Sequence, residues 1–330
     1  PPPPHFQAED GIRDDISCLV GSEMCIRDSL EGYGLTIPSA TEGIQMAAGG
    51  EVRREYMWRQ PDEVNVQGSA GSGGGAERID AAYTVYEAFV EGLIPIVQDA
   101  SLFHDLSAEL GYRYSDYSTS GGANTWKALI SWAPTPSLRF RVSYNRAIRS
   151  ANIFELYRPA GFNLGGTFDP CSGPDPIATF EQCADTGVTQ QQYGRIDPNT
   201  ANQYNTFEGG NDLLEPEVAD TMTVGVVITP SGLPGFTATV DYYDIEIEDA
   251  IDPLAYGTVM NQCINTGDPA YCDLIIRDEF GSLWNTQRGY VITTYQNVGL
   301  YGNNGVDLSL NYMHTIGNAG LISFDFAGTY

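Results

Sequence analysis

The stretch Leu138-Arg139-Phe140-Arg141-Val142-Ser143-Tyr144-Asn145 has an apolar side chain at every even position and a polar one at every odd position. Neighbouring side chains of a β-strand point to opposite faces, so such a strand has one apolar and one polar face. The same alternation recurs in segments of about ten residues. It predicts an all-β protein whose apolar faces must be covered either by a protein core or by the hydrocarbon of a bilayer.

The alternation divides the chain into a series of expected strands. Their ranges are 44–58, 83–97, 106–118, 125–133, 138–149, 221–229, 236–251, 290–316 and 321–330, of which 290–316 is one very long strand or two. Between Tyr242 and Ile245 the apolar positions change parity, which predicts a β-bulge. A Gly/Ser-rich loop is expected at 67–76 and a turn at Gly121-Gly122.

The connections between these strands differ in length in a regular way. Short turns fall near residues 99, 134, 231 and 318, whereas residues 150–219 and 252–288 form two long irregular segments. In an up-and-down meander, alternate connections lie on the same rim, so the short turns and the long loops are on opposite rims. Outer-membrane barrels sort their loops in this way. The strands are also long enough to cross a bilayer, which takes about nine to eleven residues.

A membrane barrel must be closed, because hydrocarbon offers no hydrogen-bond partner to a free strand edge. The sequence predicts about ten strands and stops within the pattern at Tyr330. We therefore expect a transmembrane antiparallel up-and-down β-barrel that is only partial, in a chain that is a fragment. A soluble β-sandwich that serves in binding or adhesion is the alternative fold.

Composition narrows the function. The 330 residues carry a net charge of −27, which repels nucleic acid. We see no apolar run long enough for a transmembrane helix.

Residues 1–30 do not fit the rest of the chain: they begin with four prolines, and residues 6–29 look like translated sequencing-adapter read-through. The alternative is a disordered leader, and the barrel portion is expected over residues 31–330.

Two motifs resemble those of the TonB-dependent outer-membrane receptors. Residues 144–157 end in a form similar to that family's aromatic-Arg-x-Pro-Asn-x-x-Glu-Leu-Tyr, although Ile148 and Ala151 replace the usual aromatic residue and proline. Residues 211–217 resemble its Asn-x-x-Leu-x-Pro-Glu. Segments 241–247, 297–299 and 305–307 are similar to later strands of the family. The matching motif residues are Arg149, Asn152, Glu155, Leu156, Tyr157, Asn211, Leu214, Pro216 and Glu217.

This resemblance implies a function. Family members form a 22-stranded barrel around an N-terminal plug in the outer membrane of Gram-negative bacteria, in contact with outer-membrane lipid. They import a scarce small-molecule nutrient, such as a ferric siderophore, cobalamin, haem or a saccharide. The energy comes from the TonB–ExbB–ExbD complex, which acts through a TonB box and plug that we do not find in this sequence. A passive porin-type channel is the alternative. Nothing resembles a catalytic constellation, so we expect no enzyme and no cofactor.

The cysteines of the two long segments lie close together in pairs, Cys171 with Cys183 and Cys263 with Cys272. In the barrel these segments are external loops, where oxidising surroundings favour disulfides. Metal binding is the alternative, but neither pair has a nearby histidine. We therefore expect two disulfides and no metal site.

Other side chains of the loops and of the polar face are candidates for binding. The aromatic candidates for contact with a ligand are Tyr157, Phe162, Phe168, Tyr193 and Tyr204. The acidic loop residues form either a solvated surface or a site for divalent cations; they are Asp169, Asp175, Glu181, Asp185, Asp197, Asp268, Asp273, Asp278 and Glu279. On the polar face, which lines the lumen of a barrel, we expect Arg113, Arg139 and Arg141 to pair with Glu87, Glu91 and Glu109 or to hold a plug.

Overall fold

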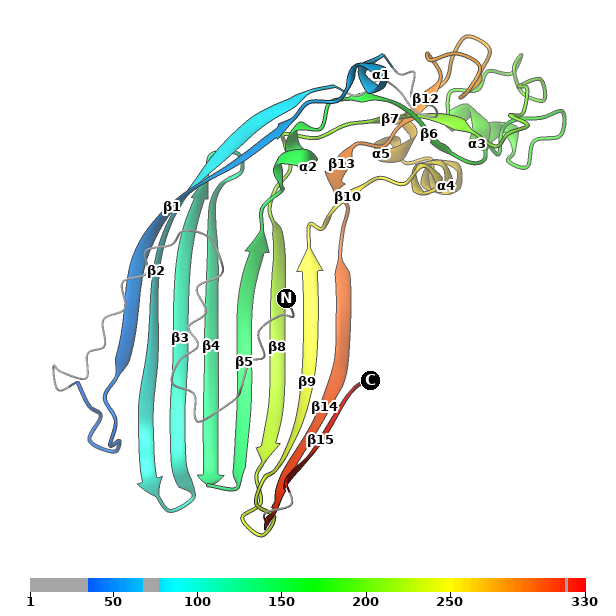
Figure 1. Cartoon of the computed structure of the whole chain (residues 1–330). Helices are drawn as coiled ribbons and strands as arrows, with labels where there is room; N and C mark the ends of the chain where they lie inside the picture. The colour runs from blue at the N-terminus through cyan, green and yellow to red at the C-terminus, as the bar shows by residue number, and fades with distance from the viewer. Residues whose placement is uncertain (1–34, 68–76, 318–319) are drawn as a thin grey trace.

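A computed structural model describes residues 35–67, 77–317 and 320–330 (Figure 1). Within these residues the main feature is a nine-stranded antiparallel sheet in the order β1-β2-β3-β4-β5-β8-β9-β14-β15. Its strands are β1 (Gln45–Arg59), β2 (Ile79–Ala100), β3 (Phe103–Tyr117), β4 (Gly121–Thr135), β5 (Leu138–Arg149), β8 (Glu217–Ile228), β9 (Phe236–Glu248), β14 (Tyr301–Ile316) and β15 (Gly320–Thr329). Strands that follow one another in this order are neighbours, so the sheet is the expected up-and-down meander.

The remaining elements are short and lie in the connections. They are α1 (Glu63–Val66), α2 (Ile153–Tyr157), β6 (Gly161–Gly166), α3 (Phe180–Asp185), β7 (Tyr204–Glu208), β10 (Ile251–Pro253), α4 (Tyr256–Thr266), α5 (Pro269–Cys272), β11 (Ile275–Ile276), β12 (Tyr290–Ile292) and β13 (Tyr295–Asn297). No helix among the described residues is sufficiently long and apolar to cross a membrane.

The register of the sheet keeps even-numbered residues opposite even-numbered residues across most of its width. One row runs from Ile130 through Val142, Val224 and Tyr242 to Val306, each directly opposite the next. All five are exposed large hydrophobic side chains, and Ile130 is 56% exposed. We call the face with the even-numbered residues the outer face. It is a continuous apolar surface of the kind that soluble monomers do not leave uncovered.

Aromatic side chains gather at two levels of the outer face. The rings of Trp126 and Tyr144 lie 5.1 Å apart, and those of Trp132 and Phe140 lie 5.5 Å apart. Trp126 and Trp132 are six residues apart on β4, which corresponds to roughly 20 Å along the strand. Barrels in membranes carry aromatic girdles at both interfaces of an apolar band that is about 25 Å tall. On a strand tilted by about 35–45°, this length spans only about 15 Å along the membrane normal, so both aromatic levels fit within such a band.

Odd-numbered residues form the inner face, and there the charged side chains pair with one another. Arg113 contacts Glu87 at 3.2 Å, as expected, and the Glu87 side chain also accepts a hydrogen bond from Ser115 at 2.5 Å. Lys127, the lysine of this face, lies 2.7 Å from Glu109 and 3.3 Å from Glu91. Each of these pairs joins neighbouring or next-neighbouring strands.

The two other arginines of this face have partners that differ from the expected ones. Arg139 pairs with Asp105 at 2.9 Å, and Arg141 forms a bidentate pair with Asp241, with N–O distances of 2.9 and 2.6 Å. Asp241 lies two strands away from Arg141, and the intervening residue is Gly225. A Cβ atom at Gly225 would collide with the Asp241 carboxylate, so the glycine allows the pair to form. The expected pairing was wrong because acid–base partners follow strand register, which sequence spacing does not show.

The connections are sorted much as expected. The β2–β3, β4–β5, β8–β9 and β14–β15 connections lie at one end of the sheet, whereas the two long segments lie at the other (Figure 1). The β3–β4 connection, residues 118–120, is short although it is on the rim of the long loops. Residues 1–34, 68–76 and 318–319 are outside the described part of the chain. The predictions for the leader, for most of the Gly/Ser-rich loop and for the centre of the last turn therefore stay predictions.

The predicted bulge in β9 is wrong. Both neighbours of β9 keep continuous register through residues 242–245. Tyr243, Ile245 and Ile247 simply lie on the inner face, and Asp244 and Glu246 lie on the outer face. The faces exchange polarity at the end of β9 that joins the long loops, where the outer face no longer contacts an apolar phase. Irregularities do occur between Pro95 and Val97 and between Trp132 and Thr135.

Candidate ligand-binding cap

The two long connections fold together into one unit, which we call the cap (residues 150–216 and 249–300). Strand β7 of the first connection pairs in parallel with β12 of the second, with Thr206 opposite Val291. Tyr204 of the first connection packs in one buried cluster with side chains of the second, including Val259, Leu283 and Val291. Sequence reasoning treated the connections as irregular. The structure shows instead a shared core, which positions both segments at the rim of the sheet (Figure 1).

The first motif and the end of the second meet at the root of the cap. Arg149 at the end of β5 lies opposite Glu217 at the start of β8, and its Nε donates to Glu217 at 2.6 Å. The same guanidinium donates to Glu155 at 2.9 Å. Glu217 in turn accepts a hydrogen bond from the backbone N–H of Ile251 at 2.7 Å. One arginine and one glutamate thus tie together the bases of both connections.

Further motif residues hold the chain that leaves β5. Asn152 caps α2 by accepting from the N–H groups of Phe154 and Glu155, while Glu155 accepts from the Asn152 N–H, which is a capping box. The Asn211 N–H donates to the Glu155 carbonyl at 2.9 Å, and its side chain donates to the Tyr295 carbonyl at 3.0 Å. These contacts join the two ends of the first connection to each other, and they join the end at Asn211 to the second connection.

The apolar motif residues form a small core beneath the cap. Leu156 and Leu214 are 4% and 3% exposed and pack with Ala151 and Ile251. Pro216, two residues after Leu214, is half-buried, whereas Tyr157 is exposed. The structure therefore brings the motif residues together as an anchor of the cap, with Tyr157 outside this anchor.

Two disulfides lie within the cap, Cys171–Cys183 and Cys263–Cys272. Closing loops of this length stabilises them by about 3 kcal/mol in the chain-entropy model. Each disulfide lies in a different buried cluster, because Cys171 and Cys183 pack with Ala178, Val188 and Ile196 whereas Cys263 and Cys272 belong to the larger core. The two bonds stabilise the two parts of the cap separately.

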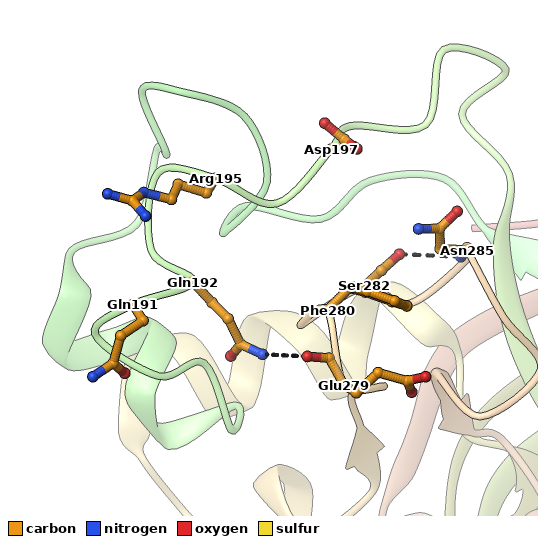
Figure 2. Close-up of a pocket in the computed structure, with 8 residues that line it drawn as sticks. All are labelled: Gln191, Gln192, Arg195, Asp197, Glu279, Phe280, Ser282 and Asn285. Atoms are coloured by element: carbon orange, nitrogen blue, oxygen red, sulfur yellow. Dashed lines mark hydrogen bonds between the residues drawn. The ribbon is translucent and has the colours of Figure 1, made fainter.

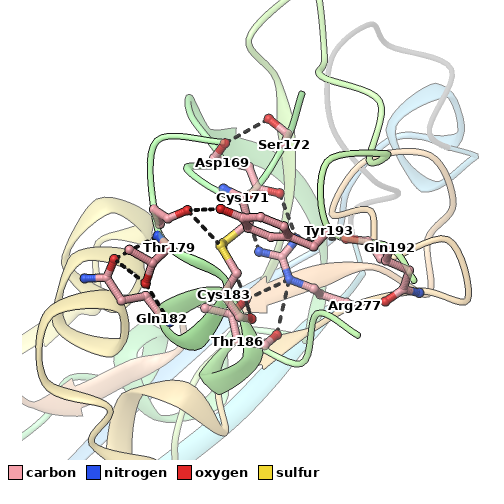
Figure 3. The surroundings of a disulfide bond; sticks show 12 residues. Asp169, Cys171, Ser172, Thr179, Gln182, Cys183, Thr186, Gln192, Tyr193 and Arg277 are labelled. Carbon is pink, nitrogen blue, oxygen red and sulfur yellow. Dashed lines mark hydrogen bonds and ion pairs between the residues drawn. A yellow bond between two sulfur atoms is a disulfide. The ribbon is translucent and has the colours of Figure 1, made fainter. Parts of the chain in front are cut away.

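A buried ion pair joins those two parts, and sequence reasoning did not find it. Arg277 of the second connection donates to both carboxylate oxygens of Asp169 in the first, at 2.7 and 3.0 Å. Their side chains are only 3% and 1% exposed. Arg277 also donates to the side chain of Thr186 at 3.0 Å (Figure 3). The available signal was an arginine directly after the apolar run Leu274-Ile275-Ile276, in a segment with few basic residues.

The aromatic candidates for ligand contact are not brought together. Tyr204 is 3% exposed and stacks on Tyr256, and Phe162 packs edge-on against Phe207. Tyr193 is half-buried, and its hydroxyl donates to the Ala178 carbonyl at 2.9 Å. Phe168, which is 50% exposed, remains open to the surroundings. Tyr204 thus contributes to the core of the cap and presents no free ring face.

The acidic residues divide into buried and exposed groups. Asp169 and Asp278 are buried, which corrects the expectation that all the loop acids form a solvated surface. Asp278 accepts from the N–H groups of Phe280 and Ser282, at 3.0 and 2.8 Å. Among the described residues no group of three or more histidine, cysteine, aspartate or glutamate side chains is placed to hold a metal ion.

Burial also changes the acidity of Tyr256 in α4. Desolvation raises the pKa of its phenol well above the ordinary value of 10.0, and the nearby Asp169 carboxylate raises it further. Its hydroxyl is buried without a hydrogen-bond partner among the described residues. The ring therefore serves as an apolar side chain that stays neutral in the folded cap.

A cavity of about 270 Å³ opens where residues 191–197 of the first connection face residues 279–285 of the second. Gln192 spans the two segments by donating to the Glu279 carbonyl at 3.1 Å, as Figure 2 shows. Trp284 makes a second bridge, from its indole N–H to the Asp197 carbonyl at 2.9 Å. These contacts make the cavity a fixed part of the cap.

The fold and this cap define the class of the protein. An antiparallel meander with an apolar outer face, a charged inner face and folded loops on one rim is part of the wall of a transmembrane β-barrel. The chain belongs to the TonB-dependent receptor-like β-barrel family, whose model matches residues 31–330.

Solved structures share this fold. The siderophore receptor PirA from Acinetobacter baumannii matches with a TM-score of 0.55 and 14% identity, over 93% of this chain and 35% of that one. A variant of the ferric enterobactin receptor PfeA from Pseudomonas aeruginosa matches with a TM-score of 0.52 and 14% identity, over 87% of this chain and 33% of that one. The chain thus spans about a third of the length of these receptors. No relative was found among curated protein sequences.

Proposed function

We propose that this chain is part of the barrel of an outer-membrane receptor that takes up a scarce nutrient, with the cap as its external binding surface. The observation that carries the proposal is the opposite character of the two faces of one sheet. The outer face exposes an unbroken row of large apolar side chains, whereas the inner face holds paired charges. A soluble sandwich would cover the apolar face with a second sheet. In the proposal, lipid acyl chains cover it.

The folded cap supports a receptor over a plain channel. The two longest connections share a core, a buried ion pair and a cavity, and each of them contains a disulfide. Such pre-organisation lowers the entropic cost of binding a ligand. Fixed ion pairs on the inner face offer a polar wall against which a plug domain can rest. The family, and the siderophore receptors whose folds are similar, point the same way.

We further propose that the complete receptor draws its energy from the TonB–ExbB–ExbD complex of a Gram-negative cell. The cargo belongs to one of the nutrient classes that such receptors import, namely a ferric siderophore, cobalamin, haem or a saccharide. Because this complex energises receptors of the outer membrane, we propose that the complete receptor lies in that membrane.

Uptake by the complete receptor tests the proposal. The full gene is expressed in a Gram-negative host, and uptake of labelled ferric enterobactin, cobalamin, haem and maltodextrin is measured with and without TonB. We expect one compound to accumulate only when TonB is present. TonB-independent uptake would indicate a passive porin. A complete protein that stays monomeric in buffer without detergent would refute the membrane barrel itself.

A further inference from the structure

The cavity of the cap is lined by polar side chains that the fold does not use. The side chains of Gln191, Arg195, Asp197 and Asn285 line it, and in the described part of the chain none of them has a hydrogen bond or an ion pair. Asn205 of the same cap shows the contrast with a side chain that the fold does use, because it donates to two carbonyl oxygens. The four unpartnered groups are therefore free to bind a ligand.

An exposed aromatic ring stands at the same place. Phe280 is 57% exposed although it belongs to a rigid turn. Its N–H donates to the buried Asp278 at 3.0 Å, and Arg277 donates to the Gly281 carbonyl at 2.8 Å. Gly281 has a φ of 77°, a conformation that glycine adopts without strain. The backbone that carries the ring is therefore held in position at the cavity before any ligand arrives.

The charges around the cavity cancel. Arg195 and Asp197 are one cation and one anion, and the Glu279 carboxylate pairs with Arg288. The cap as a whole contains fifteen aspartates and glutamates but only four arginines and no lysine. An anionic ligand such as a ferric catecholate would be repelled by this excess of negative charge. An uncharged ligand avoids that repulsion.

We propose that this cavity binds a neutral saccharide, which makes saccharides the cargo class of the proposed receptor; the inference rests on that proposed function. Amide, guanidinium and carboxylate groups each present two polar atoms side by side, which suit adjacent sugar hydroxyls that both donate and accept. The apolar C–H face of a sugar ring packs on the exposed Phe280 ring. The volume of about 270 Å³ lies just below the range of about 300–1,000 Å³ for small-molecule sites. It suits a short saccharide segment.

Calorimetric titration of the complete receptor in detergent tests this assignment. The probes are maltotriose, cellotriose, xylotriose and chitotriose, with ferric enterobactin and haem as anionic comparisons. We expect at least one saccharide to bind. The Phe280→Ala variant should weaken that binding by about tenfold, and Asn285→Ala should weaken it as well. The control is Ile177→Ala, which removes an exposed apolar side chain of the same cap outside the cavity and should leave the affinity unchanged.

The possible outcomes separate the two proposals. Binding of ferric enterobactin or haem without any saccharide would overturn the saccharide inference, while TonB-dependent uptake would keep the receptor function. Saccharide binding that is unchanged in both Phe280→Ala and Asn285→Ala would show that the sugar binds elsewhere. Absence of TonB-dependent uptake for every compound would refute the receptor function itself. Native hydrogen exchange of the cap in each variant distinguishes a lost contact from a lost fold.

Discussion

Replacing Arg277 by methionine should destabilise the cap far more than a typical loop substitution. The Asp169 side chain is only 1% exposed, and both of its carboxylate oxygens accept hydrogen bonds from Arg277. Without the guanidinium, a buried carboxylate keeps only the Cys171 N–H as a donor, at 3.0 Å. Removing one partner of a buried pair costs about 3–5 kcal/mol, because the other charge remains without compensation. The Thr186 and Gly281 oxygens would lose a donor at the same time.

Hydrogen exchange of the complete receptor, followed by mass spectrometry, measures this cost directly. Each 1.4 kcal/mol corresponds to about a tenfold change in an equilibrium constant. Amides of β7 and β12, which join the two connections, should therefore exchange at least about a hundredfold faster in Arg277→Met. Amides at the centre of β3 and β4 should not change, because the ion pair does not contact the sheet.

Two further variants make the test specific. Arg288→Met removes an ion pair with Glu279 whose arginine is 73% exposed, so it should cost only about 0–1 kcal/mol. The double variant Asp169→Leu with Arg277→Met leaves no buried charge and should recover much of the lost stability. If Arg277→Met exchanges no faster than Arg288→Met, the ion pair does not hold the two connections together and the reasoning is wrong.

Three other predictions follow from the cap and the sheet. Since burial raises the pKa of Tyr256 above 10.0, the folded cap favours the neutral phenol; its stability should be full below about pH 10 and fall as the pH rises further. Tyr256→Phe should reduce this alkaline loss in circular dichroism without lowering stability at neutral pH, and an unchanged alkaline transition would contradict the prediction. Leu110→Arg on the outer face should cost about 2–4 kcal/mol near mid-bilayer in urea refolding into vesicles, whereas Ser107→Arg on the inner face of the same strand should cost less. Equal costs at the two sites would argue against a lipid-covered outer face. The double variant Cys171→Ser with Cys183→Ser should lower the stability of the cap by about 3 kcal/mol and should be cleaved faster in limited proteolysis. If the variant is cleaved no faster than the unchanged protein, the disulfide does not stabilise the cap.

The strands of the sheet were predictable from the sequence because the alternation of apolar and polar residues can be seen within each short segment. Strand β5 has the bounds Leu138–Arg149 that alternation alone predicts, and its Phe140, Val142 and Tyr144 lie opposite even-numbered apolar residues on both neighbouring strands. Family resemblance placed Arg149 and Glu217 in motifs, but the contact between them needed the register of β5 and β8. In β9 the same alternation was misread as a bulge, because the polarity of each face changes where the strand leaves the apolar phase.

The cap was not predictable because its contacts are distant along the chain. Thr206 pairs with Val291, and Asp169 binds Arg277, across segments that show no period of their own. Tyr204 looked like a candidate for ligand contact, since an aromatic residue in a polar loop has no visible partner in the sequence. In the structure its partners come from the other connection. The resemblance indicated the two long connections as the region proposed to bind a ligand, but only the assembled connections show which of their side chains are buried.

The shared core of the two connections has a consequence for receptor engineering. A chimera that transplants residues 150–216 alone would carry Tyr204 and Asp169 to a scaffold lacking the side chains that bury them. A transplant would therefore need both segments together. It would also need Arg149 and Glu217, the ion pair that joins these segments to the adjacent strands β5 and β8.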